Sequence, residues 1–203
     1  MAKKDVEQKQ LQELLYQALE TERGGIAIYE TAVRCAQNED LREEWKEYLE
    51  QTRHHEQVLL ELFEKLKLDP ETVTPGRRIV KMKGEALVAS MEKARKEGTP
   101  DAAQLVACEA VVDAETKDHA NWELIAHVAE ETGGEVAEAL QEAVDEVEDE
   151  EDEHLYHTQG WCRELWIESL GLPAVLPPPE EEKEVKTAIG AARARHAREE
   201  MLR

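Results

Sequence analysis

Residues 144–165 read VDEVEDEEDEHLYHTQGWCREL, and this stretch decides the fold. Apolar and small residues recur in it at steps of three and four, the spacing of one buried face of an α-helix. Glu151 and His154 fall on that face, where aliphatic side chains are expected. Because burying such groups without a partner costs several kcal/mol, the pattern indicates that they share one. A Glu-x-x-His pair projecting into a helical bundle is typical of one half of a dinuclear metal site.

The remainder of the chain has the composition of a helical protein. Only 4% of its 203 residues are aromatic, and Ala, Leu, Glu, Lys and Gln are frequent. Apolar periodicity and the placement of Pro and Gly predict long helices, with a loop before the third. The predicted helices span 5–37, 40–67, 79–97, 101–132 and 135–170, and the loop spans 71–78.

The order of these helices predicts an all-α fold. Two long helices, a connection of about 30 residues and two more long helices are the layout of a four-helix bundle with one long crossover, which here contains an extra short helix. We expect the bundle to occupy 1–171, a Pro- and Glu-rich linker 172–183, and a C-terminal helical arm 184–203. The arm is either solvated or docked on the bundle or on a neighbouring subunit.

The charge balance excludes some classes of partner. The chain has 47 acidic and 25 basic residues, a formal net charge of −22. Such a surface repels phosphate backbones and anionic lipids, so we expect neither nucleic-acid nor membrane binding. No apolar run reaches the roughly 20 residues of a membrane span, and the start MAKKDVEQKQ lacks the apolar core of a secretory signal. Three widely spaced cysteines indicate reduced thiols, so we expect a cytoplasmic protein.

Polar groups also lie on the inward faces of the other long helices. Their carboxylate oxygens and imidazole nitrogens suit iron or manganese better than zinc. The candidate metal ligands are Glu22, His55, Glu56, Glu115, His119, Glu151 and His154. Tyr29, two turns from Glu22, either packs in the core or, beside a metal pair, donates a hydrogen bond or relays electrons.

Simpler interpretations of these residues remain open. A buried carboxylate can pair with an arginine, and a histidine on a partly buried face is ordinary. Glu56, Asp118 and Glu148 are most simply interpreted as surface acids. Gly24 and Gly25, each about 1 kcal/mol worse than alanine inside a helix, indicate a tolerated kink, a close approach of helices, or room for a small oxidant.

Three of these motifs resemble the ferritin-like superfamily. Glu22-x6-Tyr29 is similar to the first-helix motif of rubrerythrin-type proteins, Glu115-x-x-Asp118 to their third-helix Glu-x-x-Glu, and Glu151-x-x-His154 to their fourth-helix Glu-x-x-His. The runs YLEQTRHHEQVLLELFEKL and EVAEALQEAVDEVEDEEDEH also resemble the small, stress-linked YciE/YciF-like bacterial proteins. The likeness covers about residues 10–170. It implies a ferritin-like bundle that forms a homodimer or a larger homo-oligomer.

The second helix departs from the family pattern. Where the family has Glu-x-x-His, this chain has Thr52-x-x-His55, with Gln51 beside it. A bridging carboxylate is then missing, unless Glu56 turns inward to supply it.

The resemblance implies a carboxylate-bridged iron or manganese pair that reacts with dioxygen or hydrogen peroxide. The chain has no Cys-x-x-Cys pairs of the rubredoxin type, so an external electron donor would be needed. Two alternatives stay open: a metal-sequestering protein with little turnover, and a non-catalytic bundle that acts as a structural or interaction module.

Overall fold

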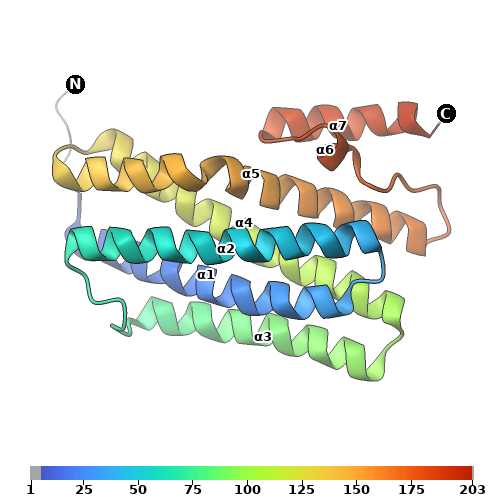
Figure 1. Ribbon diagram of the computed structural model, residues 1–203, viewed down its shortest axis with the longest axis horizontal. Coiled ribbons are helices and arrows are strands. Elements are labelled where there is room, and N and C mark those ends of the chain that lie inside the picture. Colours follow the sequence, from blue (N-terminus) through green and yellow to red (C-terminus); the bar gives the residue numbers. More distant parts are fainter. Residues whose placement is uncertain (1–5, 203) are drawn as a thin grey trace.

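The computed structural model describes residues 6–202, which form seven helices and no strands (Figure 1). The helices are α1 (Gln8–Cys35), α2 (Glu39–Leu66), α3 (Pro75–Glu97), α4 (Pro100–Glu131), α5 (Glu135–Ser169), α6 (Pro179–Glu182) and α7 (Ala188–Met201). The prediction of an all-helical bundle is confirmed. Residue 5, where the first helix was expected to begin, and residue 203, the expected end of the arm, lie outside the described residues.

Four long helices enclose the core. Helix α1 packs against α2 and α4, and α5 packs against the same two helices. Helix α3 lies outside this set, against α1 and α4. It begins at the end of the bundle where α2 finishes and ends where α4 begins, so it returns the chain along the length of the bundle (Figure 1). No helix of the described residues is long and apolar enough to cross a membrane.

The prediction of a loop over 71–78 is wrong at its end, because α3 begins at Pro75. The Thr74 side chain accepts a hydrogen bond from the backbone N–H of Arg77 at 3.1 Å and so caps the helix. Proline at the first helical position is favourable, since its missing N–H would have no partner there. The Thr-Pro pair therefore starts the helix, and α3 is 23 residues long rather than short.

Two hydrophobic clusters fill the two halves of the bundle. One contains Leu15 of α1, Leu59 of α2, Ile125 of α4 and Leu140 of α5. The second contains Tyr29, Trp45, Val111 and Trp161 from the same four helices. Between the two clusters each helix places buried polar side chains. This polar layer consists of Glu22, His55, Glu115, Asp118, Glu151 and His154.

The glycine pair in α1 brings neighbouring helices close to this layer. A Cβ atom on Gly25 would lie 3.1 Å from the Thr52 methyl carbon of α2, and one on Gly24 would lie 4.0 Å from the Cα atom of Gly84 in α3. Of the interpretations that the sequence left open, close helix approach fits these contacts best.

The C-terminal arm docks on the bundle through α5. Arg163 of α5 makes a two-pronged ion pair with Glu180 of α6, at 2.7 and 2.8 Å. Arg198 of α7 donates to Glu164, which is fully buried on α5. Figure 1 shows α7 lying along α5. Among the possibilities for the arm, the structure shows the one in which it covers its own bundle.

Candidate metal centre

The polar layer contains most of the buried polar atoms that lack a partner. Among the described side chains, ten buried nitrogen or oxygen atoms have no hydrogen-bond partner. Six of these belong to the layer: one atom each of Glu22, His55, Glu115 and Asp118, and both carboxylate oxygens of Glu151. Native structures leave few such atoms, and an ion is one of the recognised reasons for them. Their concentration at one depth of the bundle therefore indicates a shared ligand.

These atoms form two groups with the spacing that a metal ion requires. His55, Glu151 and His154 make one group, and Glu22, Asp118 and Glu151 make the other. Within each group the ligand atoms lie within 4.8 Å of one another. Glu151 is a member of both, so one carboxylate takes part in both groups.

His55 and Glu151 are close without being hydrogen-bonded. Nδ1 of His55 lies 2.8 Å from Oε1 of Glu151, and 4.0 Å from Oε1 of Glu22. Neither Nδ1 of His55 nor Oε1 of Glu151 has a hydrogen-bond partner among the described residues. This is the arrangement expected of two ligand atoms that are directed at one common position, such as that of a metal ion.

The outer nitrogens of both histidines are fixed by neighbours. Nε2 of His154 lies 2.8 Å from the amide oxygen of Gln51, and Nε2 of His55 lies 2.8 Å from Oε2 of Glu150. Both oxygens are acceptors, so each Nε2 donates a hydrogen bond to its neighbour, and in the neutral ring each Nδ1 presents its lone pair to the layer. Metal-bound histidines are usually held in this way by a hydrogen bond from the second ring nitrogen.

The carboxylates of Glu22 and Glu115 each have a polar neighbour. The indole N–H of Trp122 donates to Oε1 of Glu22 at 2.9 Å, which leaves Oε2 of Glu22 free. Oε2 of Glu115 lies 3.6 Å from Nδ1 of His154, beside the first group.

Burial and mutual repulsion shift the ionisation of these groups. Burial, followed by the charges of Asp118 and Glu151, raises the pKa of Glu22 well above its ordinary value. Burial and then Glu115 raise the pKa of Asp118 from 3.8 to about 7. Burial alone would lower the pKa of His55, but Glu150, Glu22 and Asp118 together raise it. The layer is electrostatically costly without a cation, which explains why it would attract one.

Three of the predicted ligands are outside both groups: Glu115, which lies in the layer beside the first group, and Glu56 and His119, which lie outside the layer. The Glu56 carboxylate pairs with Arg23 at 2.8 Å instead of turning inward. His119 is partly buried and faces α5, with Nε2 2.8 Å from Asp152 of that helix. Thr52 is buried but donates its hydroxyl to the carbonyl of Tyr48 at 2.8 Å, so the second helix brings no carboxylate to the layer.

Asp118 belongs to the second group and was missed as a ligand. The sequence favoured a surface acid, but the residue is only 4% exposed. Its position three residues after Glu115 was the available signal, because side chains three apart share a helix face. Gln51, Glu150 and Trp122 were not predicted as positioning residues, since such contacts depend on how the helices pack.

Tyr29 lies next to the first group. Its ring centroid is 6.1 Å from that of His154, and its hydroxyl has no hydrogen-bond partner among the described residues. Burial, followed by the negative charge of Glu115, raises its pKa well above the ordinary value. A neutral, buried phenol beside the layer fits core packing, and it equally fits hydrogen-bond donation or electron relay beside a metal pair.

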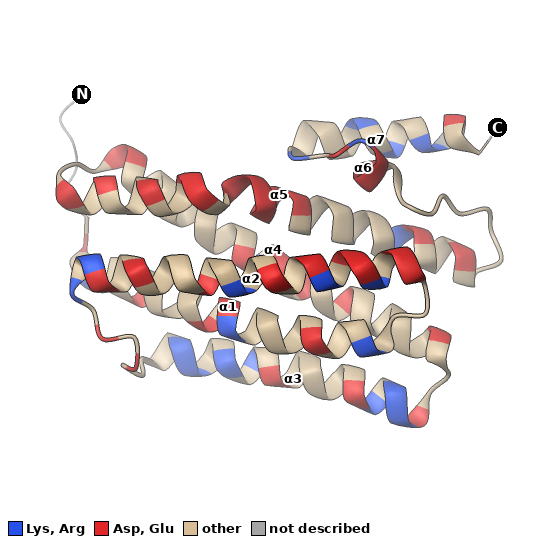
Figure 2. Ribbon diagram, viewed as in Figure 1, with Lys and Arg blue, Asp and Glu red and all other residues tan. Residues whose placement is uncertain are grey.

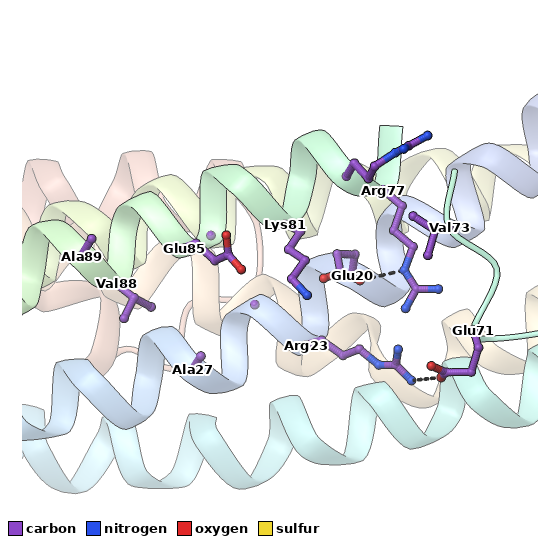
Figure 3. Close-up of a pocket in the computed structure, with 13 residues that line it drawn as sticks. Glu20, Arg23, Ala27, Glu71, Val73, Arg77, Lys81, Glu85, Val88 and Ala89 are labelled. Atoms are coloured by element: carbon purple, nitrogen blue, oxygen red, sulfur yellow. Dashed lines mark hydrogen bonds and ion pairs between the residues drawn. The ribbon is translucent and has the colours of Figure 1, made fainter. Parts of the chain in front are cut away.

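A large surface groove lies on another side of the bundle. It has a volume of about 780 Å³ and runs between α1 and α3 (Figure 3). Two of its arginines are paired with acids, Arg77 with Glu20 at 2.7 Å and Arg23 with Glu71 at 3.3 Å. It contains no residue of the polar layer.

Comparisons with protein-family models, with curated proteins and with solved structures gave no significant match to this chain.

The raised pKa values predict how stability depends on pH. Asp118 holds a proton in the folded chain up to about pH 7 but loses it near 3.8 when unfolded, so stability falls as pH rises between those values. The raised pKa of His55 acts in the same direction. Between pH 5.5 and 7 the folded chain holds the Asp118 proton and the unfolded chain does not, and this part of the range corresponds to about 2 kcal/mol. We therefore expect the metal-free protein to be about 2 kcal/mol less stable at pH 8 than at pH 5.5.

Urea denaturation in the presence of a chelator, followed by circular dichroism, measures this difference. Asp118→Asn is the matched control, and it should reduce the slope without removing it, because the raised pKa values of Glu22, His55 and Glu151 act in the same direction. A wild-type profile that is already flat, or that rises with pH, would contradict the buried, protonated cluster.

Proposed function

We propose that the polar layer binds two neighbouring iron or manganese ions and uses them in redox chemistry with dioxygen or hydrogen peroxide. The observation that carries the proposal is the set of six unpartnered, buried ligand atoms that converge from α1, α2, α4 and α5. The resemblance of these helices to the ferritin-like superfamily supports the same assignment.

The donor atoms favour these metals. The group of Glu22, Asp118 and Glu151 offers carboxylate oxygens alone, whereas His55, Glu151 and His154 offer two nitrogens and a carboxylate. Oxygen-rich, mixed sites suit iron and manganese, and zinc prefers more nitrogen or sulfur. The two positions are chemically different, so we expect the ions to bind with unequal affinities.

The protein side chains would hold and orient the centre. Glu151 would contribute to both positions, and Gln51 and Glu150 would orient His154 and His55 through hydrogen bonds to their Nε2 atoms. A bound metal pair supplies a two-electron change to a small oxidant. Burial of the layer excludes bulk water, and the phenol of Tyr29 is placed to donate a hydrogen bond. Electrons would come from an external donor.

A second candidate is metal sequestration with little turnover. The specific observation in its favour is that Thr52 and Glu56 bring no carboxylate from α2, so that Glu151 is the only carboxylate shared by the two groups. Turnover with hydrogen peroxide and a reductant separates the two candidates, and metal content separates both from a purely structural bundle.

The direct test is metal binding by the purified protein. Chelator-treated chain, titrated without oxygen with Fe²⁺ or Mn²⁺, should take up about two ions per chain, as expected for a dinuclear bundle site. Elemental analysis after gel filtration measures the bound metal. Protein that retains essentially no iron or manganese would contradict both metal-binding candidates.

A further inference from the structure

A second pocket, lined by acidic residues, opens from the surface toward the polar layer. It lies between α4 and α5 and has a volume of about 320 Å³. Glu151, which is only 2% exposed, lines the inner part of this pocket. Both of its carboxylate oxygens lack a hydrogen-bond partner among the described residues. None of the other described pockets is lined by a residue of the polar layer.

The outer part of this pocket is lined by further cation ligands. Glu123 and Glu148 are exposed, and His119 and Asp152 are partly buried. Because Asp152 accepts from Nε2 of His119, the lone pair of Nδ1 is free, and Nδ1 lies 3.9 Å from Oε2 of Glu123. These four residues do not form a group whose ligand atoms are close enough together to hold one metal ion. Their arrangement suits brief contact with an ion rather than retention.

The charge of the surface also differs between the two sides of the bundle. Figure 2 shows acidic residues along α5, while basic residues gather on α3. The groove beside α3 is lined by four basic and three acidic side chains, Arg23, Arg77, Arg78 and Lys81 with Glu20, Glu71 and Glu85. The pocket between α4 and α5 is lined by Glu123, Glu148, Glu151 and Asp152 and by no lysine or arginine, so it attracts a divalent cation more strongly than the groove does.

The C-terminal arm forms one wall of the pocket. Thr187, which caps α7, and Ala188, its first residue, both line it. Nearby Lys186 pairs with Glu153 of α5 at 2.8 Å and so holds the start of the arm on the bundle. The arm therefore narrows the opening.

We propose that this pocket is the route by which divalent cations reach the centre, with His119, Glu123 and Asp152 as a transient binding station and the start of α7 as its outer wall. The route presupposes the metal centre proposed above. It gives His119 a role in delivery instead of in permanent coordination.

Anaerobic stopped-flow loading of the full chain with Co²⁺, followed by the visible absorption of the bound ion, tests the route. In the double variant Glu123→Lys and Glu148→Lys, we expect loading to slow by about tenfold or more at low ionic strength, because steering by surface charge changes on-rates by 10- to 1,000-fold. High salt should shrink the difference, and the final number of bound ions should stay unchanged. Ala188→Trp should also slow loading, at any salt concentration, because it narrows the opening.

The matched control is Glu168→Lys, an exposed acid near the end of the same helix α5, which should load like wild type. If the double variant and Ala188→Trp both load within twofold of wild type, the route is wrong while the centre stands. If wild type binds no Co²⁺, Fe²⁺ or Mn²⁺, the centre itself fails. A fall in final stoichiometry in the double variant with an unchanged rate would also overturn the route, because it would make these residues permanent ligands.

Discussion

Glu151→Gln is expected to abolish binding of both metal ions. Glu151 is the only residue shared by the two ligand groups, and its two oxygens are both unpartnered. A neutral amide has one oxygen and no charge, so it cannot join two cations. In contrast, Glu22→Gln and His154→Gln each change one group only, and we expect each to retain about one of the two ions of a dinuclear site.

Elemental analysis of the three variants, after anaerobic loading and gel filtration, gives the comparison. His54→Ala is the matched control, because His54 neighbours His55 in sequence but is exposed and faces Glu146 at 3.2 Å. It should bind as much metal as wild type. If Glu151→Gln still binds two ions, or if all three variants lose metal equally, Glu151 is not the bridge between two positions.

Much of this architecture followed from helix periodicity. The stripe through Glu151 and His154 placed both residues inward, and both are at most 2% exposed. The same argument found Glu22, His55 and Glu115, because a buried position is recognised by its apolar neighbours at three- and four-residue steps. The bundle and its crossover followed from the lengths and order of the helices.

The missed features depend on contacts between helices. Whether Glu56 turns inward is decided by Arg23, which lies on a different helix and holds its carboxylate. The burial of Asp118 depends on the rotation of α4, which places both this residue and Glu115 against the core. In an acid-rich chain, composition cannot separate one buried aspartate from its many solvated neighbours. Periodicity identifies a helix face only to within about one residue of rotation, and this uncertainty caused the error at Asp118.

Glu151→Leu is expected to stabilise the metal-free protein, although it removes a residue from the core. In the chelated state Glu151 is buried beside Asp118 and Glu115, which together with burial raise its pKa well above the ordinary value. Leucine removes this unfavourable burial and repulsion, so we expect a gain of about 1 kcal/mol or more, because each unit by which a pKa is raised corresponds to about 1.4 kcal/mol. Unfolding in urea at pH 8 with chelator measures the gain. Saturating Mn²⁺ should then stabilise wild type, by about 2.7 kcal/mol at a hundredfold excess over its dissociation constant, and leave the variant unchanged.

Glu20→Leu gives the opposite result if this reasoning is correct. Glu20 is a largely buried acid, but it pairs with Arg77 at 2.7 Å, and both side chains are at most 11% exposed. Removing one partner of a buried ion pair leaves the second charge uncompensated, so we expect a loss of about 3 kcal/mol with or without metal. If Glu151→Leu destabilised the chelated protein as Glu20→Leu does, the polar layer would be a structural network. A gain in stability with a loss of the metal response means that Glu151 is retained for binding, at a cost to the stability of the metal-free fold.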